Sequence, residues 1–235
     1  MKRFDVLVLA VALVLSAAVF GVFFYHARSG GDAITVVGAA TERVTSDVVK
    51  WRLTFGRNMS TGEVASGYAV VASDARSIVA SLEAAGIPAG DVVVHPVTVQ
   101  PVYAGAGGSM SGYNVNQSIT VTSKDVGKIE ALAANPADLI GRGVMLQDSM
   151  LNYFVSDIAQ VKQSLLAAAT EDARKRAAEI ARNAGVSLGK VRSARAGVFQ
   201  ITEPYSTEVS DYGIYSTWTR EKDATVTVRA EFSVR

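Results

Sequence analysis

The sequence predicts an α+β fold in which antiparallel sheets of period-two strands are covered by two long amphipathic helices. Three observations support this fold class. Several segments alternate apolar and polar residues, two longer segments repeat apolar residues at helical spacing, and those two segments end in closely similar sequences. A further apolar segment near the N-terminus predicts a transmembrane helix in front of the fold.

Three segments indicate half-buried antiparallel strands, because one face of each is apolar and the other is polar. In VKWRLTF, Trp51 and Phe55 alternate with polar and charged residues. In YNVNQSITVT, the apolar residues share a face with Gln117. The C-terminal ATVTVRAEFSVR alternates without exception, and its apolar face comprises Ala224, Val226, Val228, Ala230, Phe232 and Val234.

The first covering helix is expected to begin near Ser60, where S-T-G-E offers a capping box through Glu63. Gly86 and Pro88 are expected to end it. Its predicted inward stripe comprises Val64, Tyr68, Val71, Ala75, Ile78 and Leu82.

The second helix is expected to extend from about Asp157 to Ala184, with oppositely charged pairs four residues apart at Glu171–Lys175 and Asp172–Arg176. The small residues of its stripe suit a close approach to a sheet. The predicted inward residues are Ile158, Val161, Leu165, Ala169, Ala173, Ala177 and Ile180.

A shorter helix is expected between Asp125 and Ala133. A turn at Asn135-Pro136 and a strand through MLQDSMLNYFV follow it.

Two stretches of the chain resemble each other. DARSIVASLEAAGIPAGDVVV begins at Asp74, and DARKRAAEIARNAGVSLGKVRS begins at Asp172. Each leaves its helix through a glycine that can adopt the left-handed conformation, and each is followed by a segment ending in proline and tyrosine, VTVQPVY or FQITEPY. The pattern predicts two helix–strand–loop–strand units. They are either ancient duplicates or two instances of a common way to end a helix.

An uncharged run of apolar residues begins at Val6 and ends at Phe24, long enough to cross a lipid bilayer as a helix. Lys2 and Arg3 precede it, so the positive-inside rule places the N-terminus in the cytoplasm and the rest of the chain outside. A cleaved signal peptide is the alternative, because Ala27-Arg28-Ser29 resembles a cleavage site. The predicted domains are an anchor or signal peptide over residues 1–30 and an exported domain over residues 31–235.

The composition excludes several classes of protein. The chain has 235 residues, 49% of them hydrophobic and 19% charged, with a formal net charge of +1, so it carries no electrostatic signature of a nucleic-acid binder. It has no cysteine, which excludes disulfides, cysteine nucleophiles and thiolate metal sites.

The stretches ITVVGAATERVTSDVVKWRLTF, YNVNQSITVT, LLAAATEDARKRAAEIARNAGVSLGKV and ATVTVRAEFSV resemble the SIMPL domain family, over roughly Ile34 to Val234. This family includes bacterial exported proteins of unknown function, the periplasmic immunogenic protein group among them. The resemblance implies an exported α+β domain, often behind a signal or anchor, and large homo-oligomeric rings in some members. It implies no set of catalytic residues.

Candidate catalytic residues are few. His26 lies at the membrane edge, and His95 lies in a predicted strand before a proline. Glycines between residues 105 and 112 suggest a hairpin tip, because the phosphate-loop pattern is missing. The scattered acidic residues are expected on solvated surface, Asp148, Asp157, Glu203 and Glu208 among them. We therefore expect no enzyme activity, no cofactor and no metal.

Residues 203–222 form a long predicted loop that carries Tyr205, Tyr212, Tyr215 and Trp218. Loops of this length are uncommon in compact domains, and tyrosine and tryptophan are enriched where proteins meet. The loop is expected to contact a neighbouring subunit or partner, with a self-packed loop or a disordered one as alternatives. If it makes such contacts, residues 211–219 should be removable without loss of the fold.

The function predicted from these features is a structural or interaction module that is anchored through the run ending at Phe24 and self-assembles into a homo-oligomer. It would pass once through the bacterial inner membrane, with its C-terminal domain in the periplasm or outside the cell. A periplasmic binding module for a small ligand, peptide or envelope component is the first alternative, and a carboxylate-based hydrolase is the second.

Overall fold

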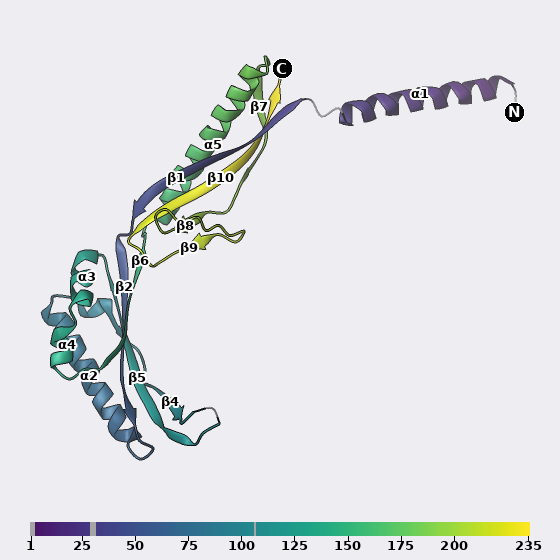
Figure 1. The fold of residues 1–235 in the computed structure, drawn as a ribbon. Coiled ribbons are helices and arrows are strands. Elements are labelled where there is room, and N and C mark those ends of the chain that lie inside the picture. The colour runs from purple at the N-terminus through teal and green to yellow at the C-terminus, as the bar shows by residue number, and fades with distance from the viewer. Residues whose placement is uncertain (1–2, 29–31, 106) are drawn as a thin grey trace. The chain divides into compact units, whose positions relative to one another are not determined.

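The computed structural model describes residues 3–28, 32–105 and 107–235, and it has an α+β fold with five α-helices and two five-stranded sheets in this part of the chain (Figure 1). The elements are α1 (Arg3–Arg28), β1 (Ala33–Thr45), β2 (Val48–Met59), α2 (Val64–Ala84), the 3₁₀ helix η1 (Ala89–Asp91), β3 (Val92–Val94), β4 (Thr98–Tyr103), β5 (Met110–Ser123), α3 (Val126–Ala134), α4 (Ala137–Gly141), β6 (Leu146–Phe154), α5 (Ile158–Asn183), β7 (Leu188–Ala196), β8 (Gln200–Thr202), β9 (Ile214–Tyr215) and β10 (Glu221–Val234).

The chain divides into two compact units. Unit 1 comprises Met1–Ala40, Leu166–Gly197 and Val226–Arg235, and unit 2 comprises Thr41–Leu165 and Val198–Thr225. The elements β1, α5 and β10 therefore contribute residues to both units. The predicted domain boundary between residues 30 and 31 lies outside the described residues.

The two sheets share part of their strand connections. In the first sheet the order is β1-β10-β8-β9, and β7 also pairs with β10; in the second it is β3-β5-β2-β6, and β4 also pairs with β5. In each sheet, one long strand has three partners: β10 pairs with β1, β7 and β8, and β5 pairs with β2, β3 and β4. The remaining strand differs, because β9 pairs with β8 in the first sheet, whereas β6 pairs with β2 in the second. β5 is antiparallel to β2, β3 and β4, and β10 is antiparallel to β7 and β8, whereas β8 and β9 are parallel. The shared helix–strand–strand connections around β5 and β10 resemble the two predicted helix–strand–loop–strand units, while a duplication origin stays a prediction.

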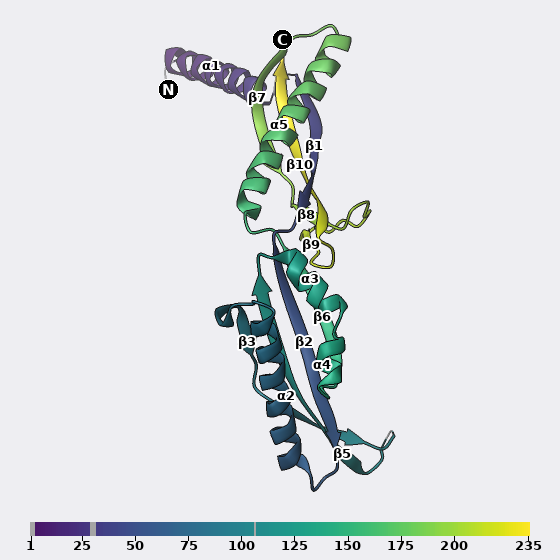
Figure 2. The same ribbon diagram turned by 90° about the vertical axis from the view of Figure 1, so that its left-hand side faces the viewer.

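In unit 2, the helices α2, α3 and α4 cover one face of the second sheet (Figure 2). The predicted alternation of β2 is confirmed, because its inward residues are almost completely buried beneath these helices. This core contains Val49, Trp51, Leu53 and Phe55 of β2, with Val115, Ile119 and Val121 of β5 and Val71, Ile78 and Leu82 of α2.

In unit 1, α5 covers one face of the first sheet, and the residues at the contact are mostly small. The core contains Val36, Ala173, Ala177, Ala230 and Phe232. A Cβ atom added to Gly38 would lie 2.3 Å from the backbone oxygen of Ala169 and 2.3 Å from the backbone nitrogen of Ala173. The helix therefore approaches β1 backbone to backbone, as its small-residue stripe predicts.

The predicted alternation of buried and exposed residues along the C-terminal strand, β10, is confirmed. The residues Ala224, Val226, Val228, Ala230 and Phe232 are each at most 2% exposed. Val234, at the end of β10, is only half-buried.

The predicted start and inward stripe of α2 are partly wrong. The helix begins at Val64, and the hydroxyl of Ser60 donates to the Glu63 carboxylate at 2.6 Å, with no side-chain cap on the helix. Tyr68 is 44% exposed, whereas Gly67 occupies the buried position. A Cβ atom at residue 67 would lie 2.7 Å from Cγ of Met59 and 3.1 Å from Cγ2 of Val115, so a larger residue would have to displace these side chains. The glycine therefore fits the close contact with the sheet, and Tyr68 points outward.

The bounds of α5 agree with the prediction to within one residue, but its stripe shifts near the C-terminal end. Ile180 is 47% exposed, and Ala181 is buried in its place at 2%. The close approach of the helix to the sheet favours the smaller side chain.

Both predicted glycine stops are present. Gly86 has a φ of 77° and Gly185 a φ of 71°, and each follows the last turn of its helix. The predicted short helix is α3, whose first turn is capped by Asp125 accepting from the Lys128 amide at 3.1 Å. Sequence patterns missed α4 and the two-residue strand β9.

At the N-terminus, α1 is an apolar helix whose described side chains, including those of Leu13, Val14 and Phe20, are exposed. In the described residues, no helix reaches both the length and the hydropathy expected of a membrane span. The cleavage-site alternative involves Ser29, which lies outside the described residues.

Candidate interaction surface

The loop between β8 and β10 is anchored by its second half. The short strand β9 runs parallel to β8, and the amide of Ser216 donates to the carbonyl of Ile201 at 2.8 Å. The carbonyl of Thr217 accepts from the Tyr153 amide at 2.8 Å, and the hydroxyl of Thr217 donates to the side-chain oxygen of Asn152 at 2.8 Å. Residues 214–219 are thereby joined to β8 and to β6, the last strand of the second sheet.

A buried lysine closes this half of the loop. Lys222 has no exposed surface, and its ammonium group donates to the carbonyl oxygens of Ser216 at 2.7 Å and Thr219 at 2.6 Å. Burial lowers the pKa of Lys222, and the charge of Glu203 raises it in part. Sequence analysis missed this residue, although it occupies an inward position of the alternation that continues backwards from Ala224.

The four aromatic residues predicted as contact residues differ in exposure. Tyr212 is 98% exposed, Tyr205 is 86% exposed and Trp218 is 62% exposed. Tyr215 is less exposed, at 41%, because its ring stacks against Phe154 at 6.3 Å between centroids. The loop thus presents three aromatic side chains to solvent and packs the fourth against its own unit. Their contact with a partner stays a prediction.

Tyr205 is held in an unusual conformation at the start of the loop. Its φ of 64° is the one left-handed value among the described residues other than glycine, a conformation that side chains with a Cβ atom adopt at an energetic cost. Its amide donates to Asp223 at 3.2 Å, and the guanidinium of Arg43 lies 4.8 Å from its ring centroid. The hydrogen bond between Arg43 and Asp223 raises the pKa of the arginine and lowers the pKa of the aspartate.

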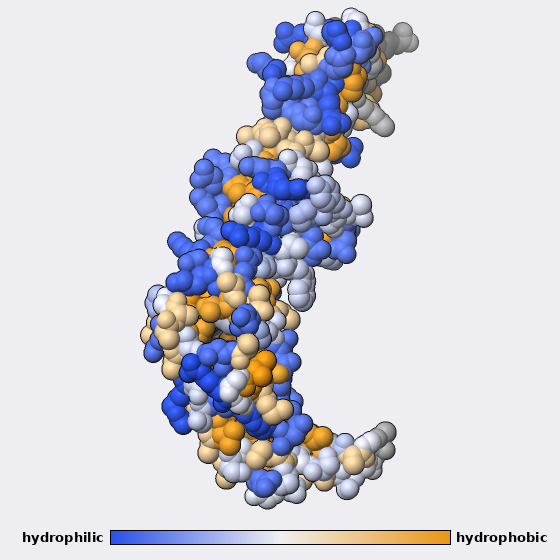
Figure 3. Space-filling view, turned by 60° about the vertical axis from the view of Figure 1, so that its left-hand side comes forward, coloured by the Kyte–Doolittle hydropathy of each residue, from blue (hydrophilic) through white to orange (hydrophobic). Residues whose placement is uncertain are grey.

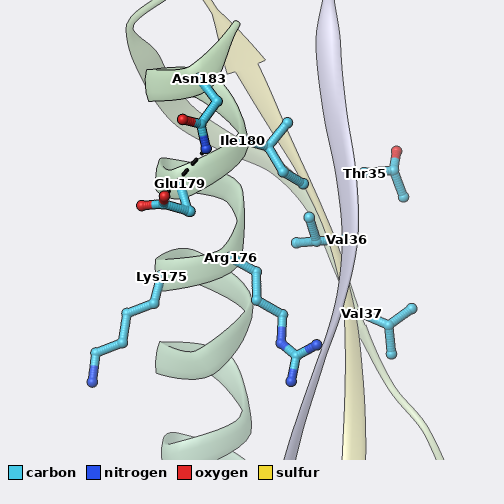
Figure 4. A pocket seen from close by; sticks show the side chains of 8 residues that line it. All are labelled: Thr35, Val36, Val37, Lys175, Arg176, Glu179, Ile180 and Asn183. Atoms are coloured by element: carbon cyan, nitrogen blue, oxygen red, sulfur yellow. Dashed lines mark hydrogen bonds between the residues drawn. The ribbon is translucent and has the colours of Figure 1, made fainter.

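A second surface feature is a groove between β1 and α5 in unit 1 (Figure 4). Its volume is about 750 Å³, and Figure 4 shows Val36, Arg176 and Ile180 turned towards the space between strand and helix. Two of its charged groups are already paired, since Arg176 contacts Asp172 at 2.7 Å and Glu179 accepts from Asn183 at 3.2 Å. The other lining residues are Thr35, Val37 and Lys175.

The groove lies along the outer edge of a sheet. β1 is the terminal strand in the order of the first sheet, and among the described residues no strand pairs with its outer edge, although the Ala39 amide of β1 donates to Asp172 of α5. An extended peptide can add to such an edge through its backbone and place alternate side chains in the neighbouring groove.

The structure separates the candidate catalytic residues. His95 follows β3; its ring nitrogen Nε2 lies 3.0 Å from the Thr120 hydroxyl, and its amide donates to the carbonyl of Ser118 at 2.9 Å. Asp148 is exposed on β6, and Glu203 accepts from the Ser216 hydroxyl at 3.2 Å. Across residues 3–28, 32–105 and 107–235, no three histidine or carboxylate side chains gather closely enough to hold a metal ion.

On the face of the molecule in Figure 3, hydrophobic residues form small patches between hydrophilic ones. The loop aromatics are contact candidates as individual exposed side chains.

A family model extends over almost all of the chain outside α1. The model for SIMPL, described as a protein of unknown function (DUF541), matches residues 34–234. The chain belongs to the SIMPL family. No curated protein matches the sequence. Within this SIMPL protein, the matched range begins in β1, covers parts of unit 1 and all of unit 2, and ends with β10.

Proposed function

We propose that this SIMPL protein is a membrane-anchored exported interaction module that associates with copies of itself through the loop at residues 203–222, without catalytic chemistry. The observation that carries the proposal is the loop's construction. Trp218 lies on the half that is fixed to β6 and β8, the Tyr205 amide is bonded to Asp223, and Tyr212 lies between these two anchored parts; all three side chains project into solvent. An aromatic side chain on a fixed backbone loses little conformational entropy on binding, which favours it at interfaces.

Membrane anchoring is supported by the N-terminal segment. The uncharged run from Val6 to Phe24 lies within α1, and the described side chains of this helix are exposed to solvent. Such a surface is stable in a lipid bilayer and unfavourable in water. Lys2 and Arg3 would place the N-terminus in the cytoplasm and the two units in the periplasm or outside the cell, with one pass through the bacterial inner membrane.

Light scattering on the full-length protein in a non-ionic detergent tests self-association. We expect an oligomer, and we expect Tyr212→Ser and Trp218→Ser to weaken it about thirtyfold each, which corresponds to the roughly 2 kcal/mol of an interface hot spot. Tyr103→Ser is the matched control, because Tyr103 is a 59% exposed aromatic residue of unit 2 outside the loop. A strict monomer at high concentration would falsify the proposal.

Fractionation tests the anchor separately. We expect the full-length protein to stay in the membrane pellet after alkaline carbonate extraction, and Leu13→Arg combined with Val14→Arg to release it. Release of the unaltered protein would leave the anchor without support, whatever its oligomeric state.

A binding module for an extended peptide is the second candidate function, and the groove along β1 favours it. Its exposed Ile180 would accept an apolar side chain, while the unpaired edge of β1 would accept the peptide backbone. A thermal-shift screen with a library of extended peptides tests this candidate. Stabilisation that is lost in Ile180→Glu supports it, and a library without any stabilising peptide opposes it.

A further inference from the structure

The sheet of unit 1 has one covered face and one open face. On β10, Val228, Ala230 and Phe232 are buried beneath α5. Because side chains alternate along a strand, Arg229 and Glu231 lie on the opposite face. Residues directly opposite each other on neighbouring strands share a face, so the register of β7 with β10 places Arg195 on the same face as Arg229.

Two arginines on this open face lie directly opposite each other. In the antiparallel pairing of β10 with β7, Arg229 is the cross-strand partner of Arg195. The Cβ atoms of such partners lie roughly 5 Å apart, and like charges in this position destabilise a sheet. Both side chains are exposed. Within the described residues, neither guanidinium forms a hydrogen bond or an ion pair with a protein group.

The neighbouring carboxylate does not neutralise this pair. Glu231 pairs across the strands with Ser193, whose hydroxyl donates to it at 3.4 Å, and its other oxygen lies 3.8 Å from a guanidinium nitrogen of Arg192. Among the described residues, Glu231 therefore forms an ion pair with Arg192 and none with Arg195 or Arg229. The surface keeps an excess of positive charge at Arg195 and Arg229.

The two guanidinium groups line a hollow of about 360 Å³. Its remaining lining residues are Thr35, Ser193, Ala230 and Glu231. The hydroxyl of Thr35 on β1 adds a neutral donor to the two charged groups. The hollow therefore holds two planar sets of N–H donors and a hydroxyl, in a space larger than a phosphate group requires.

We infer that Arg195 and Arg229 bind a phosphate group, supplied either by inorganic phosphate or by the headgroup of an anionic phospholipid. A guanidinium presents its donors as a fork that matches two oxygens of a phosphate, and a tetrahedral anion has enough oxygens for both forks and for Thr35. Its charge also removes the repulsion between the paired arginines. This site is in unit 1 and does not depend on the loop proposed for self-association.

Thermal unfolding of the full-length protein in non-ionic detergent tests the inference. We expect the melting temperature to rise saturably with sodium phosphate and to respond much less to sodium chloride of equal ionic strength. In a second arm, micelles are doped with phosphatidylglycerol or with phosphatidylcholine. A rise with phosphatidylglycerol alone identifies a lipid headgroup as the source, and a rise with inorganic phosphate identifies the free anion.

Arg195→Gln and Arg229→Gln should each weaken the response about tenfold or more, the loss expected for one charged hydrogen-bonding group. In chloride alone, the double variant should melt no lower than the unaltered protein, because the like-charge repulsion is gone. Arg182→Gln is the matched control. It removes the same charge from unit 1, where Arg182 pairs with Glu179 on α5, and should keep the full response.

The inference is overturned if neither phosphate nor phosphatidylglycerol raises the melting temperature, or if the glutamine variants respond as the unaltered protein does. Should the double variant fail to fold, Arg229→Glu serves instead, because it places opposite charges across the strands. It should fold stably and lose the phosphate response.

Discussion

The ammonium group of Lys222 donates a hydrogen bond of 2.7 Å to the carbonyl oxygen of Ser216, from a position without exposed surface. A second bond, to Thr219, makes the lysine a link between β10 and the second half of the loop. Breaking these two bonds would leave buried polar groups without partners, which costs free energy. The bonds of Lys222 therefore hold the second half of the loop against the rest of unit 2.

Replacing Lys222 with methionine should destabilise the protein by about 2–3 kcal/mol, because two buried carbonyl groups lose their donor while the side-chain volume is kept. Equilibrium unfolding in urea measures the change. Lys190→Met is the control, since Lys190 is exposed on β7 and should cost less than about 0.5 kcal/mol. Equal losses in the two variants would show that the bonds of Lys222 contribute nothing specific.

The same lysine gives stability a pH dependence. Burial lowers its pKa in the folded protein, so the unfolded chain binds more protons between that value and about 10.4. Stability from this group therefore increases as the pH rises through that interval. We expect the increase to vanish in Lys222→Met when unfolding is measured at successive alkaline pH values, and an unchanged slope would contradict this assignment.

Deletion of residues 211–219 should destabilise unit 2 as well as any assembly. The deletion removes β9, the acceptors of Lys222 and the Thr217 contacts with β6, so the structure leads us to expect a loss of stability where the sequence led us to expect none. Melting temperatures of the deletion and of Tyr212→Ser distinguish the two roles. We expect a large drop for the deletion and almost none for the point variant, whose side chain is 98% exposed.

The two aspartates that begin the resembling stretches, Asp74 and Asp172, should respond to acid in opposite directions. Desolvation raises the pKa of Asp74 although Arg57 lies 2.8 Å away, so stability from Asp74 falls as the pH rises from about 3.9 through its folded pKa. The amide of Ala39 donates to Asp172 at 2.9 Å and lowers its pKa, so stability from Asp172 is present above about 3.9 and is lost as the pH falls through its folded pKa.

Unfolding measured between pH 2 and pH 6 in Asp74→Asn and Asp172→Asn checks this contrast. The first substitution should steepen the loss of stability in acid, because it removes a group that favours the folded state there. The second should flatten it. Changes of the same sign in both variants would mean that the two aspartates share one environment after all.

Sequence patterns predicted the parts of the fold that depend on neighbours along the chain. The glycine stops at Gly86 and Gly185 and the burial of alternate residues in β10 follow from local backbone geometry and from a period of two. These local features do not depend on where the helix or strand lies in the fold.

Features that depend on distant residues could not be predicted in the same way. Gly67 faces the sheet and Tyr68 faces solvent, because the side chain of Met59 of β2 occupies the space between α2 and the sheet next to Gly67. The juxtaposition of Arg195 and Arg229 depends on the strand register, which shifts at Glu231 and Phe232. A shift of one residue would have separated the two charges, and no pattern within either strand reveals it.

The contact between Gly38 and α5 gives the last prediction. A Cβ atom at residue 38 would lie 2.3 Å from the backbone oxygen of Ala169 and from the backbone nitrogen of Ala173, and neither atom can move without displacing the helix. Gly38→Ala should therefore cost about 3 kcal/mol, the upper part of the range for overpacked cores. Gly127→Ala is the matched control, because a Cβ there meets nothing within 4 Å and alanine favours a helix such as α3 by roughly 0.5–1 kcal/mol. Urea unfolding should give opposite signs for the two substitutions. A neutral Gly38→Ala would mean that α5 does not rest on β1 backbone to backbone in solution, and the groove between them would then lose its wall.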